Sequence, residues 1–188
     1  MVNEVTHLPL PTALRAMASS AGVTAVLLAR RRLHNPRTWV GRRVSFADGT
    51  SGRVYRETVA VRPSLDDPAV LIVEFRLRGV RGRGHAVFRP ISLLNTPLFA
   101  GFPGFVSKLW LAHDEEGRYR GVYQWDGPEL AVSYARALWW ALALVSDHGS
   151  IHYRVLPGLR RDAFLRDPGL AGAVTVGEPA WWRPAAAA

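Results

Sequence analysis

Phe105-Val-Ser-Lys-Leu-Trp-Leu111 and Tyr119-Arg-Gly-Val-Tyr-Gln-Trp125 are two β-rich runs, joined by the polar turn His113-Asp-Glu-Glu-Gly-Arg118. Two such runs around a short polar turn are typical of a β-hairpin. Working outward from the hairpin, we predict a strand and a helix before it and a helix and a strand after it, at residues 69–77, 87–99, 128–146 and 150–156. The predicted order is therefore strand, helix, strand, strand, helix, strand.

This order is that of the ferredoxin-like βαββαβ plan, so the predicted fold class is α+β. In this plan, helices cover one face of a single sheet. The other face must be covered by a partner or by an extra segment of the chain. A ligand pocket is expected between the sheet and the helices.

The second helix of the plan has a clear predicted start and a clear apolar face. Asp126 or Gly127 can cap the helix, and Pro128 has a backbone dihedral already suited to the first turn. An apolar stripe with a spacing of four residues follows, formed by Leu130, Tyr134, Leu138 and Leu142. We expect this helix to pack in the core, and the alternative is that its aromatic residues form the wall of a pocket.

Segments at both ends extend this plan. The pattern predicts a helix over Pro11 to Leu33 and a hairpin formed by residues 40–46 and 52–61. We therefore divide the chain into an N-terminal helix and β-hairpin extension (1–66), a ferredoxin-like domain (67–160) and a C-terminal tail (161–188). Residues 176–188 are expected to be poorly ordered, except where Trp181 and Trp182 anchor them.

Composition excludes several classes of function. The chain has no cysteine, which excludes disulfides, thiol nucleophiles and cysteine-ligated metal sites. The histidines show no metal-ligand spacing, and the glycine-rich stretch Gly79-Val-Arg-Gly-Arg-Gly84 lacks the spacing of a dinucleotide fingerprint, so we expect neither a metal nor a dinucleotide cofactor. The absence of disulfides fits a cytoplasmic protein, which is the predicted location. No apolar stretch approaches the ~20 residues that span a bilayer, so we predict no membrane partner.

The net charge of +9 raises the question of nucleic-acid binding. Lys108 is the single lysine among 24 lysine and arginine residues, and the arginines are spread along the chain. Arg30-Arg31-Arg32 is the one tight cluster. A nucleic-acid interface needs a concentrated basic stripe and a recognisable reading element, so we predict no nucleic-acid partner.

Strand periodicity sorts the remaining polar and aromatic side chains into an apolar-aromatic face and a mixed-polar face. Lys108 and Trp110 share a face by period two. A compact ammonium can lose its proton when desolvated, whereas a guanidinium cannot, so Lys108 is a candidate base. The alternative for Lys108 is an extended side chain whose amine reaches solvent. His152 is a second candidate base, or a hydrogen-bonded structural histidine.

Pro103-Gly104-Phe105, Lys108-Leu109-Trp110 and Gly121-Val122-Tyr123 occur at matching points of a known fold. Together with Tyr134 near the start of its helix, they give residues 68–160 a resemblance to the small monooxygenase-like proteins of the dimeric α+β barrel superfamily. The resemblance implies a homodimer whose sheets pack face to face and a pocket between sheet and helices. Members act on phenolic polyketides as cofactor-free oxygenases, while others cyclise polyketides or bind haem.

We therefore expect a tailoring enzyme that acts, in the manner of a monooxygenase or a cyclase, on an aromatic or polyketide-type molecule. The alternative is a dimer that binds a ligand or haem without catalysis. Such an enzyme needs a base, a cation and a dry aromatic wall. The predicted catalytic residues are Lys108, His152 and Arg154, and the predicted substrate-binding residues are Trp110, Tyr123, Trp125, Tyr134 and Trp139.

Overall fold

The computed structural model describes residues 7–79, 93–172 and 179–187. Its α-helices are α1 (Leu10–Ala29), α3 (Pro128–Val145) and α4 (Arg161–Arg166). The 3₁₀ helices are η1 (Leu93–Leu98), η2 (His148–Ser150) and η3 (Pro168–Ala171). The strands are β1 (Leu33–His34), β2 (Arg43–Phe46), β3 (Ser51–Ala60), β4 (Pro68–Arg76), β5 (Phe105–Leu111), β6 (Arg118–Asp126), β7 (His152–Pro157) and β8 (Pro184–Ala187).

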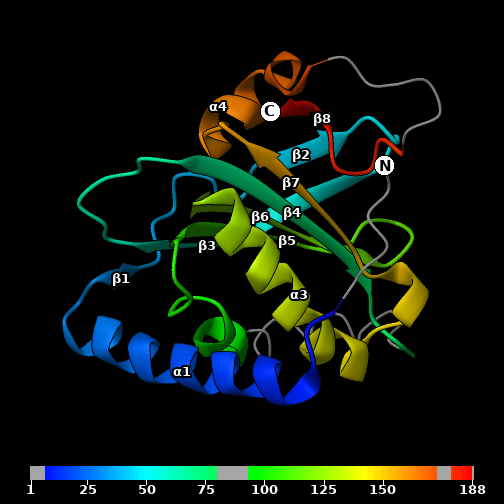
Figure 1. Cartoon of the computed structure of the whole chain (residues 1–188). Helices are drawn as coiled ribbons and strands as arrows, with labels where there is room; N and C mark the ends of the chain where they lie inside the picture. The colour runs from blue at the N-terminus through cyan, green and yellow to red at the C-terminus, as the bar shows by residue number, and fades with distance from the viewer. Residues whose placement is uncertain (1–6, 80–92, 173–178, 188) are drawn as a thin grey trace.

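The strands form one curled antiparallel sheet in the order β7-β4-β6-β5-β3-β2-β8, and β1 pairs with β3 outside this path (Figure 1). The four strands predicted for the central plan correspond to β4, β5, β6 and β7. The N-terminal hairpin corresponds to β2 and β3, and β3 pairs along β5. The predicted boundary at residue 66 thus lies between two strands of one sheet.

The first predicted helix, over residues 87–99, differs from the plan. Residues 87–92 lie outside the described part of the chain, and the segment that follows is the 3₁₀ helix η1 with Pro97 inside it. Proline lacks the amide hydrogen that a longer α-helix needs, which fits a short helix at this point. The complete βαββαβ order is therefore not confirmed, while the mixed α/β architecture with an antiparallel sheet is.

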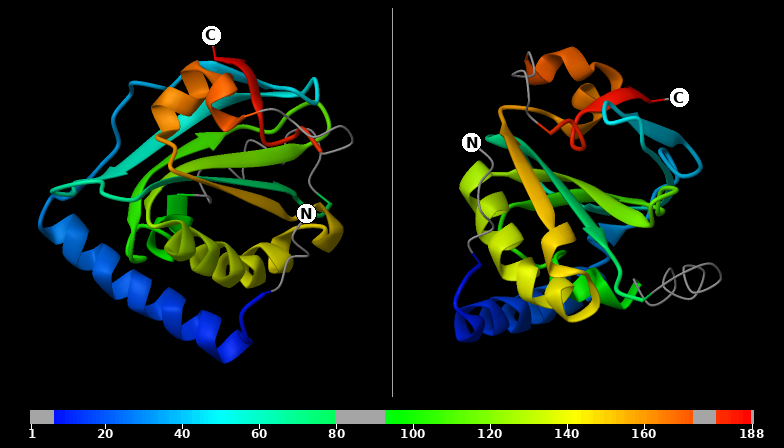
Figure 2. Two further views of the ribbon diagram at one scale, coloured as in Figure 1. Left: turned by 45° about the horizontal axis from the view of Figure 1, so that its top comes forward. Right: turned by 90° about the vertical axis from the view of Figure 1, so that its right-hand side faces the viewer.

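Two apolar cores lie on opposite faces of the sheet. The first, under α1, α3 and η1, is built around Phe99, Phe105, Trp125 and Tyr134. Figure 2 shows α1 and α3 on one side of the sheet, and α4 with the C-terminal strand on the other. The second core, under α4, β2 and β8, contains Trp39, Phe46, Phe164 and Trp182 among its buried residues.

The chain itself therefore covers the mixed-polar face. We expected a partner sheet on that face, and the structure supplies the extra segment instead. Arg161 at the start of α4 is buried there, and its guanidinium donates to Glu57 Oε1 at 2.7 Å and to Ser107 Oγ at 2.9 Å. The expectation of a loose C-terminal tail is wrong for residues 179–187, because β8 pairs with β2 and Trp182 is buried. The homodimer stays a prediction. It is no longer needed to cover the mixed-polar face, because segments of the same chain cover that face.

Helix α1 has an unusual distribution of side chains. Its buried contacts are small or polar, at Ala13, Ser20 and Thr24, and Ser20 Oγ donates to the carbonyl oxygen of Pro97 at 2.7 Å. Its larger apolar side chains, including Leu14 and Leu28, face outward. By length and composition the helix is able to cross a membrane, with a mean hydropathy of 1.4 over a window that is 17% buried. The expectation that no stretch reaches this limit is therefore wrong, although a signal sequence or a core helix passes the same test.

Candidate functional site

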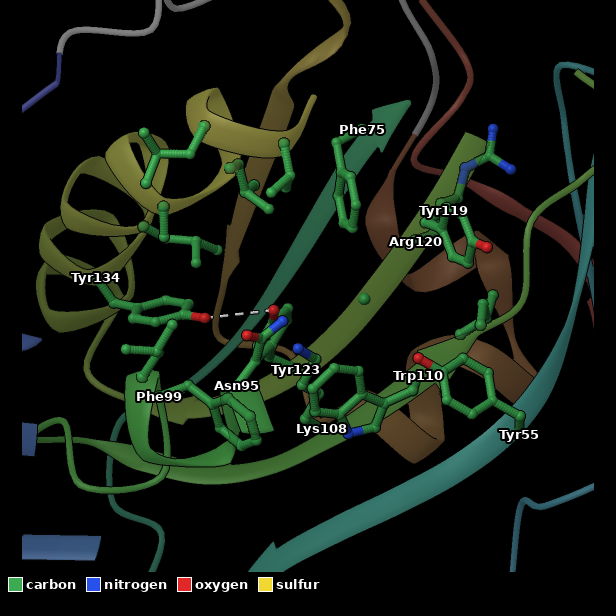
Figure 3. A pocket seen from close by; sticks show the side chains of 18 residues that line it. Tyr55, Phe75, Asn95, Phe99, Lys108, Trp110, Tyr119, Arg120, Tyr123 and Tyr134 are labelled. Carbon is green, nitrogen blue, oxygen red and sulfur yellow. Dashed lines mark hydrogen bonds between the residues drawn. The ribbon is translucent and has the colours of Figure 1, made fainter. Parts of the chain in front are cut away.

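On the apolar-aromatic face, a cavity of about 280 Å³ lies between the sheet and α3. Strands β3 to β6 form its floor, η1 closes one side, and the C-terminal half of α3 forms its roof (Figure 3). Leu144, at the rim, is 82% exposed, so this part of the lining is open to solvent. The volume is slightly below the 300–1,000 Å³ range of drug-sized sites, which suits a small ligand.

Lys108 places a single amine in this aromatic cavity. Strand β5 points the side chain away from the second core, and the residue is only 7% exposed. Its Nζ lies 3.3 Å from the centroid of the Trp110 ring, 4.6 Å from that of Phe99 and 4.8 Å from that of Tyr123. Within the described residues, Nζ has neither a hydrogen bond nor a carboxylate partner, so the aromatic faces form its surroundings.

Burial lowers the pKa of Lys108 well below its ordinary value, and the positive charge of Arg56 lowers it further. The aromatic faces oppose this shift because they attract the ammonium form. Each such contact contributes about 0.5–2 kcal/mol, whereas taking an ammonium out of water costs several kcal/mol. Without an acidic partner to offset that cost, desolvation is the larger effect. Lys108 is therefore suited to accept a proton inside the cavity.

Two tyrosines supply the hydroxyl groups of the site. Tyr134 Oη donates to Tyr123 Oη at 3.4 Å, from α3 to β6 (Figure 3). Burial raises the pKa of both phenols, so they stay protonated at neutral pH and can donate hydrogen bonds. A neutral amine beside two phenol donors can take a proton from a ligand and stabilise the anion that remains.

Gly121 makes room for this arrangement. A Cβ atom built at this position would lie 2.7 Å from Cε2 of Tyr123, which is closer than side-chain carbons approach. The Tyr123 ring therefore folds back over the backbone of its own strand at a position where any side chain would displace it. Gly121 also lines the cavity directly.

The guanidinium of Arg120 belongs to a buried ion cluster rather than to the ligand-binding part of the cavity. Although Arg120 contributes to the lining, its guanidinium forms an ion pair with Glu74 and lies 3.3 Å from Asp114 and 3.1 Å from Asp48. Burial raises the pKa of Glu74, and Arg120 opposes that rise. The cluster holds β4, β6 and the β2–β3 turn together.

The structure brings four of the predicted site residues together: Lys108, Trp110, Tyr123 and Tyr134 all line the cavity. Trp125 lies in the core behind it, with its ring 4.9 Å from that of Tyr134. Trp139 lies on another side of α3, where it stacks on His7 at 4.6 Å. Both tryptophans were predicted to bind substrate, and neither of them lines the cavity.

His152 and Arg154 lie on the opposite face of the sheet from Lys108. Their partners across the ladder are Glu74 and Ile72, whose side chains face the second core. The ring of His152 lies 5.9 Å from Trp181, and the guanidinium carbon of Arg154 lies 5.0 Å from the Trp182 ring. Burial lowers the pKa of His152, with a further contribution from Arg118. The structure therefore does not bring His152 and Arg154 together with Lys108, and their predicted catalytic role stays a prediction.

Several lining residues were missed by the sequence reasoning. Tyr55 comes from the predicted extension, while Asn95 and Phe99 come from η1 and the turn that follows it. The long helix predicted there gave no indication that these side chains face β5. None of the described histidines lines the cavity, so this lining offers no imidazole ligand for haem iron.

Comparisons with known proteins give one distant structural similarity. No model of a known protein family matches the sequence, and no curated protein matches it either. A crystal structure from Listeria monocytogenes is similar over 57% of this chain and 63% of its own chain, with 14% identity and a TM-score of 0.41. That protein is described as an uncharacterised ferredoxin-fold protein related to antibiotic biosynthesis monooxygenases.

Proposed function

We propose that this protein is a small-molecule tailoring enzyme of the monooxygenase-like or cyclase-like kind, which binds an aromatic or polyketide-type substrate in the cavity. The observation that carries the proposal is the position of the Lys108 amine. It is buried, has no described carboxylate or hydrogen-bond partner, and is surrounded by aromatic rings. An amine in these surroundings favours its neutral form and can act as a general base on a phenol or an activated carbon.

The chemistry begins with transfer of a proton from the substrate to Lys108. The Tyr123 and Tyr134 hydroxyls, which burial keeps protonated, donate to the substrate anion. In the oxygenase reaction, the carbanion of an activated CH₂ group donates electrons to O₂. The CH₂ group becomes C=O, with one oxygen atom retained and the other leaving as water. In the cyclase reaction, the same carbanion attacks a carbonyl carbon of the same substrate.

Turnover of a panel of polyphenols and anthrone-type compounds, in air and under nitrogen, tests this proposal. The oxygenase reaction predicts product only in air, and cyclisation predicts product in both. Lys108→Met should reduce either reaction by at least about 100-fold, as expected for loss of a general base. Binding without turnover under both atmospheres would instead favour a non-catalytic ligand-binding protein.

A further inference from the structure

We propose that Lys108 also acts as a nucleophile and forms an imine with an aldehyde or ketone group of a small aromatic ligand in the cavity. This inference rests on the proposed function in one respect, namely that the cavity binds such a ligand. It assigns an additional reaction to the site and narrows the ligand class to carbonyl compounds.

The surroundings of the amine carry the proposal. A carboxylate partner stabilises the charged form of a lysine. No carboxylate among the described residues lies against Lys108, and the nearest groups are the rings of Trp110, Phe99 and Tyr123. The site is open at Leu144, so a ligand can enter and water can leave. Desolvation beside a second cation is a recognised way to activate a lysine as a nucleophile, and Arg56 is that second cation here.

The reaction balances without an added oxidant or reductant. The lone pair of Nζ attacks the carbonyl carbon, and the carbonyl oxygen becomes a hydroxyl group. One proton of Nζ moves to that oxygen to make the hydroxyl, and the hydroxyl then leaves as water with the second proton of Nζ, so that a C=N bond remains. Tyr123 and Tyr134 are placed to donate to the carbonyl oxygen during the attack, because their hydroxyls meet in the same cavity.

The chain offers an unusually clear test, because Lys108 is its single lysine. The full-length protein is incubated with 4-hydroxybenzaldehyde and sodium cyanoborohydride, which reduces the imine to a stable amine. Mass spectrometry of peptides then separates the adduct on Lys108 from an adduct on the α-amino group of the chain. We expect Lys108 to react at least tenfold faster than the α-amino group at neutral pH. Modification of the α-amino group without modification of Lys108 would overturn the proposal.

A second arm separates this proposal from the proposed function. 4-Methylphenol has a similar shape but no carbonyl group, and its binding is followed by quenching of tryptophan fluorescence. We expect 4-methylphenol to slow the trapping of the aldehyde on Lys108. This measurement uses the wild-type protein alone, so it does not depend on the folding of a variant. If 4-methylphenol binds and no adduct forms on Lys108, the imine is excluded while the ligand-binding function stands. If neither compound binds, both proposals fail.

A different observation, on α1, supports a second proposal. One outward side of this helix carries Leu10, Leu14 and Leu28, which share it by helical spacing and are 43–56% exposed. The helix contains no acidic residue, and Arg30-Arg31-Arg32 follows it directly. We infer that α1 lies flat on an anionic lipid surface, with its apolar side chains in the interface and the arginines against lipid phosphates.

Charge favours lipid over a second copy of the chain. Antiparallel pairing of two α1 helices would bring Arg15 and the Arg30-Arg31-Arg32 cluster of both copies together, with no acidic side chain on either helix. The contacts of Ser20 and Thr24 with the rest of the protein favour a surface position over a spanning one.

Vesicle co-sedimentation tests this second proposal. The full-length protein should bind vesicles of mixed phosphatidylcholine and phosphatidylglycerol, but bind pure phosphatidylcholine vesicles at least tenfold more weakly, and salt should weaken the binding. Leu14→Ser with Leu28→Ser should abolish it, whereas Leu170→Ser, at an exposed site outside α1, should not. Absence of vesicle binding by the wild type, or equal binding by the α1 double variant and Leu170→Ser, would overturn the proposal. If the wild type self-associates and the α1 double variant does not, this side of α1 binds a second copy of the chain instead.

Discussion

The side-chain nitrogen of Lys108 lies 3.3 Å from the centroid of the Trp110 indole ring. The same ring lies 5.4 Å from the guanidinium carbon of Arg56, so one indole contacts two basic groups. Burial lowers the pKa of both basic groups, and for Lys108 the charge of Arg56 adds to the effect. The cavity therefore holds an amine whose neutral form is favoured by its surroundings rather than by a hydrogen bond to a carboxylate.

Replacing Lys108 with Met should stabilise the protein at neutral pH. The folded-state pKa of Lys108 lies below the unfolded value of about 10.4, so the unfolded chain binds more protons between these two values. The wild type therefore carries a penalty at neutral pH of roughly 1.4 kcal/mol for each unit of the shift, and Met removes it while keeping most of the volume.

Urea unfolding of both proteins over a pH series measures this difference. The stability gap should be largest below the folded-state pKa of Lys108 and should close as the pH rises to about 10.4, where the unfolded lysine also loses its charge. A Lys108→Met protein that is less stable at neutral pH, with a gap that does not change with pH, would show that Lys108 is an ordinary charged lysine.

Gly121→Ala should weaken ligand binding more than it weakens folding. The new Cβ would meet the Tyr123 ring at 2.7 Å, so the ring must shift, and this ring lines the cavity. We expect at least a tenfold loss of affinity for 4-methylphenol, measured by tryptophan fluorescence. Gly149→Ala is the matched control, because a Cβ there meets nothing within 4 Å. Equal affinity in the two variants would contradict the assigned ligand position.

The buried pair of Arg161 and Glu57 should stabilise the cover of the second core. Glu57→Gln leaves Arg161 with only the partly exposed carboxylate of Asp162, at 2.7 Å, so the free energy of unfolding should fall by about 1.5–3 kcal/mol. Asp147→Asn breaks the exposed pair with Arg76, whose side chains are 52% and 41% exposed, and should change it by less than about 1 kcal/mol. Chemical denaturation measures the free energy of unfolding of both variants. Equal losses in the two variants would refute the role of Glu57.

Trp182→Ala should destabilise the protein although Trp182 lies six residues from the C-terminus. Trp182 is 4% exposed and packs into the second core, so its removal should cost about 3–5 kcal/mol. Leu170→Ala, at a site that is 49% exposed, is the control and should cost much less. Thermal unfolding measures both. A Trp182→Ala protein with the wild-type melting temperature would mean that residues 179–187 are an appendage rather than part of the fold.

Much of the central sheet could be predicted from local patterns. Strands β4 to β7 have clear alternation or β-rich composition, and Gly127 and Pro128 mark the start of α3 at the predicted position. The shared face of Lys108 and Trp110 also follows from strand periodicity, and both side chains lie in the cavity. The apolar stripe of α3 was predicted as core packing, and Tyr134 does pack in the core while its hydroxyl reaches the site.

The rest depends on contacts between segments far apart in the sequence. Nothing near Trp182 indicates that it packs into the second core, since that position depends on the path of the whole chain. His152 and Arg154 were assigned to the site because local spacing does not give the register of β7 against β4. That register places Arg154 opposite Ile72 and His152 opposite Glu74. The side chains of His152 and Arg154 therefore point away from the cavity.

Transfer of a proton from an aromatic ligand to Lys108 can be observed in the absorption spectrum of 4-nitrophenol bound to the protein, at a pH about one unit below the pKa of the free phenol. We expect the yellow phenolate band in the bound state of the wild type and its loss in Lys108→Met, because only the wild type has an amine to take the proton. A bound phenol that stays neutral in the wild type, or a phenolate band of equal strength in Lys108→Met, would contradict this proton transfer.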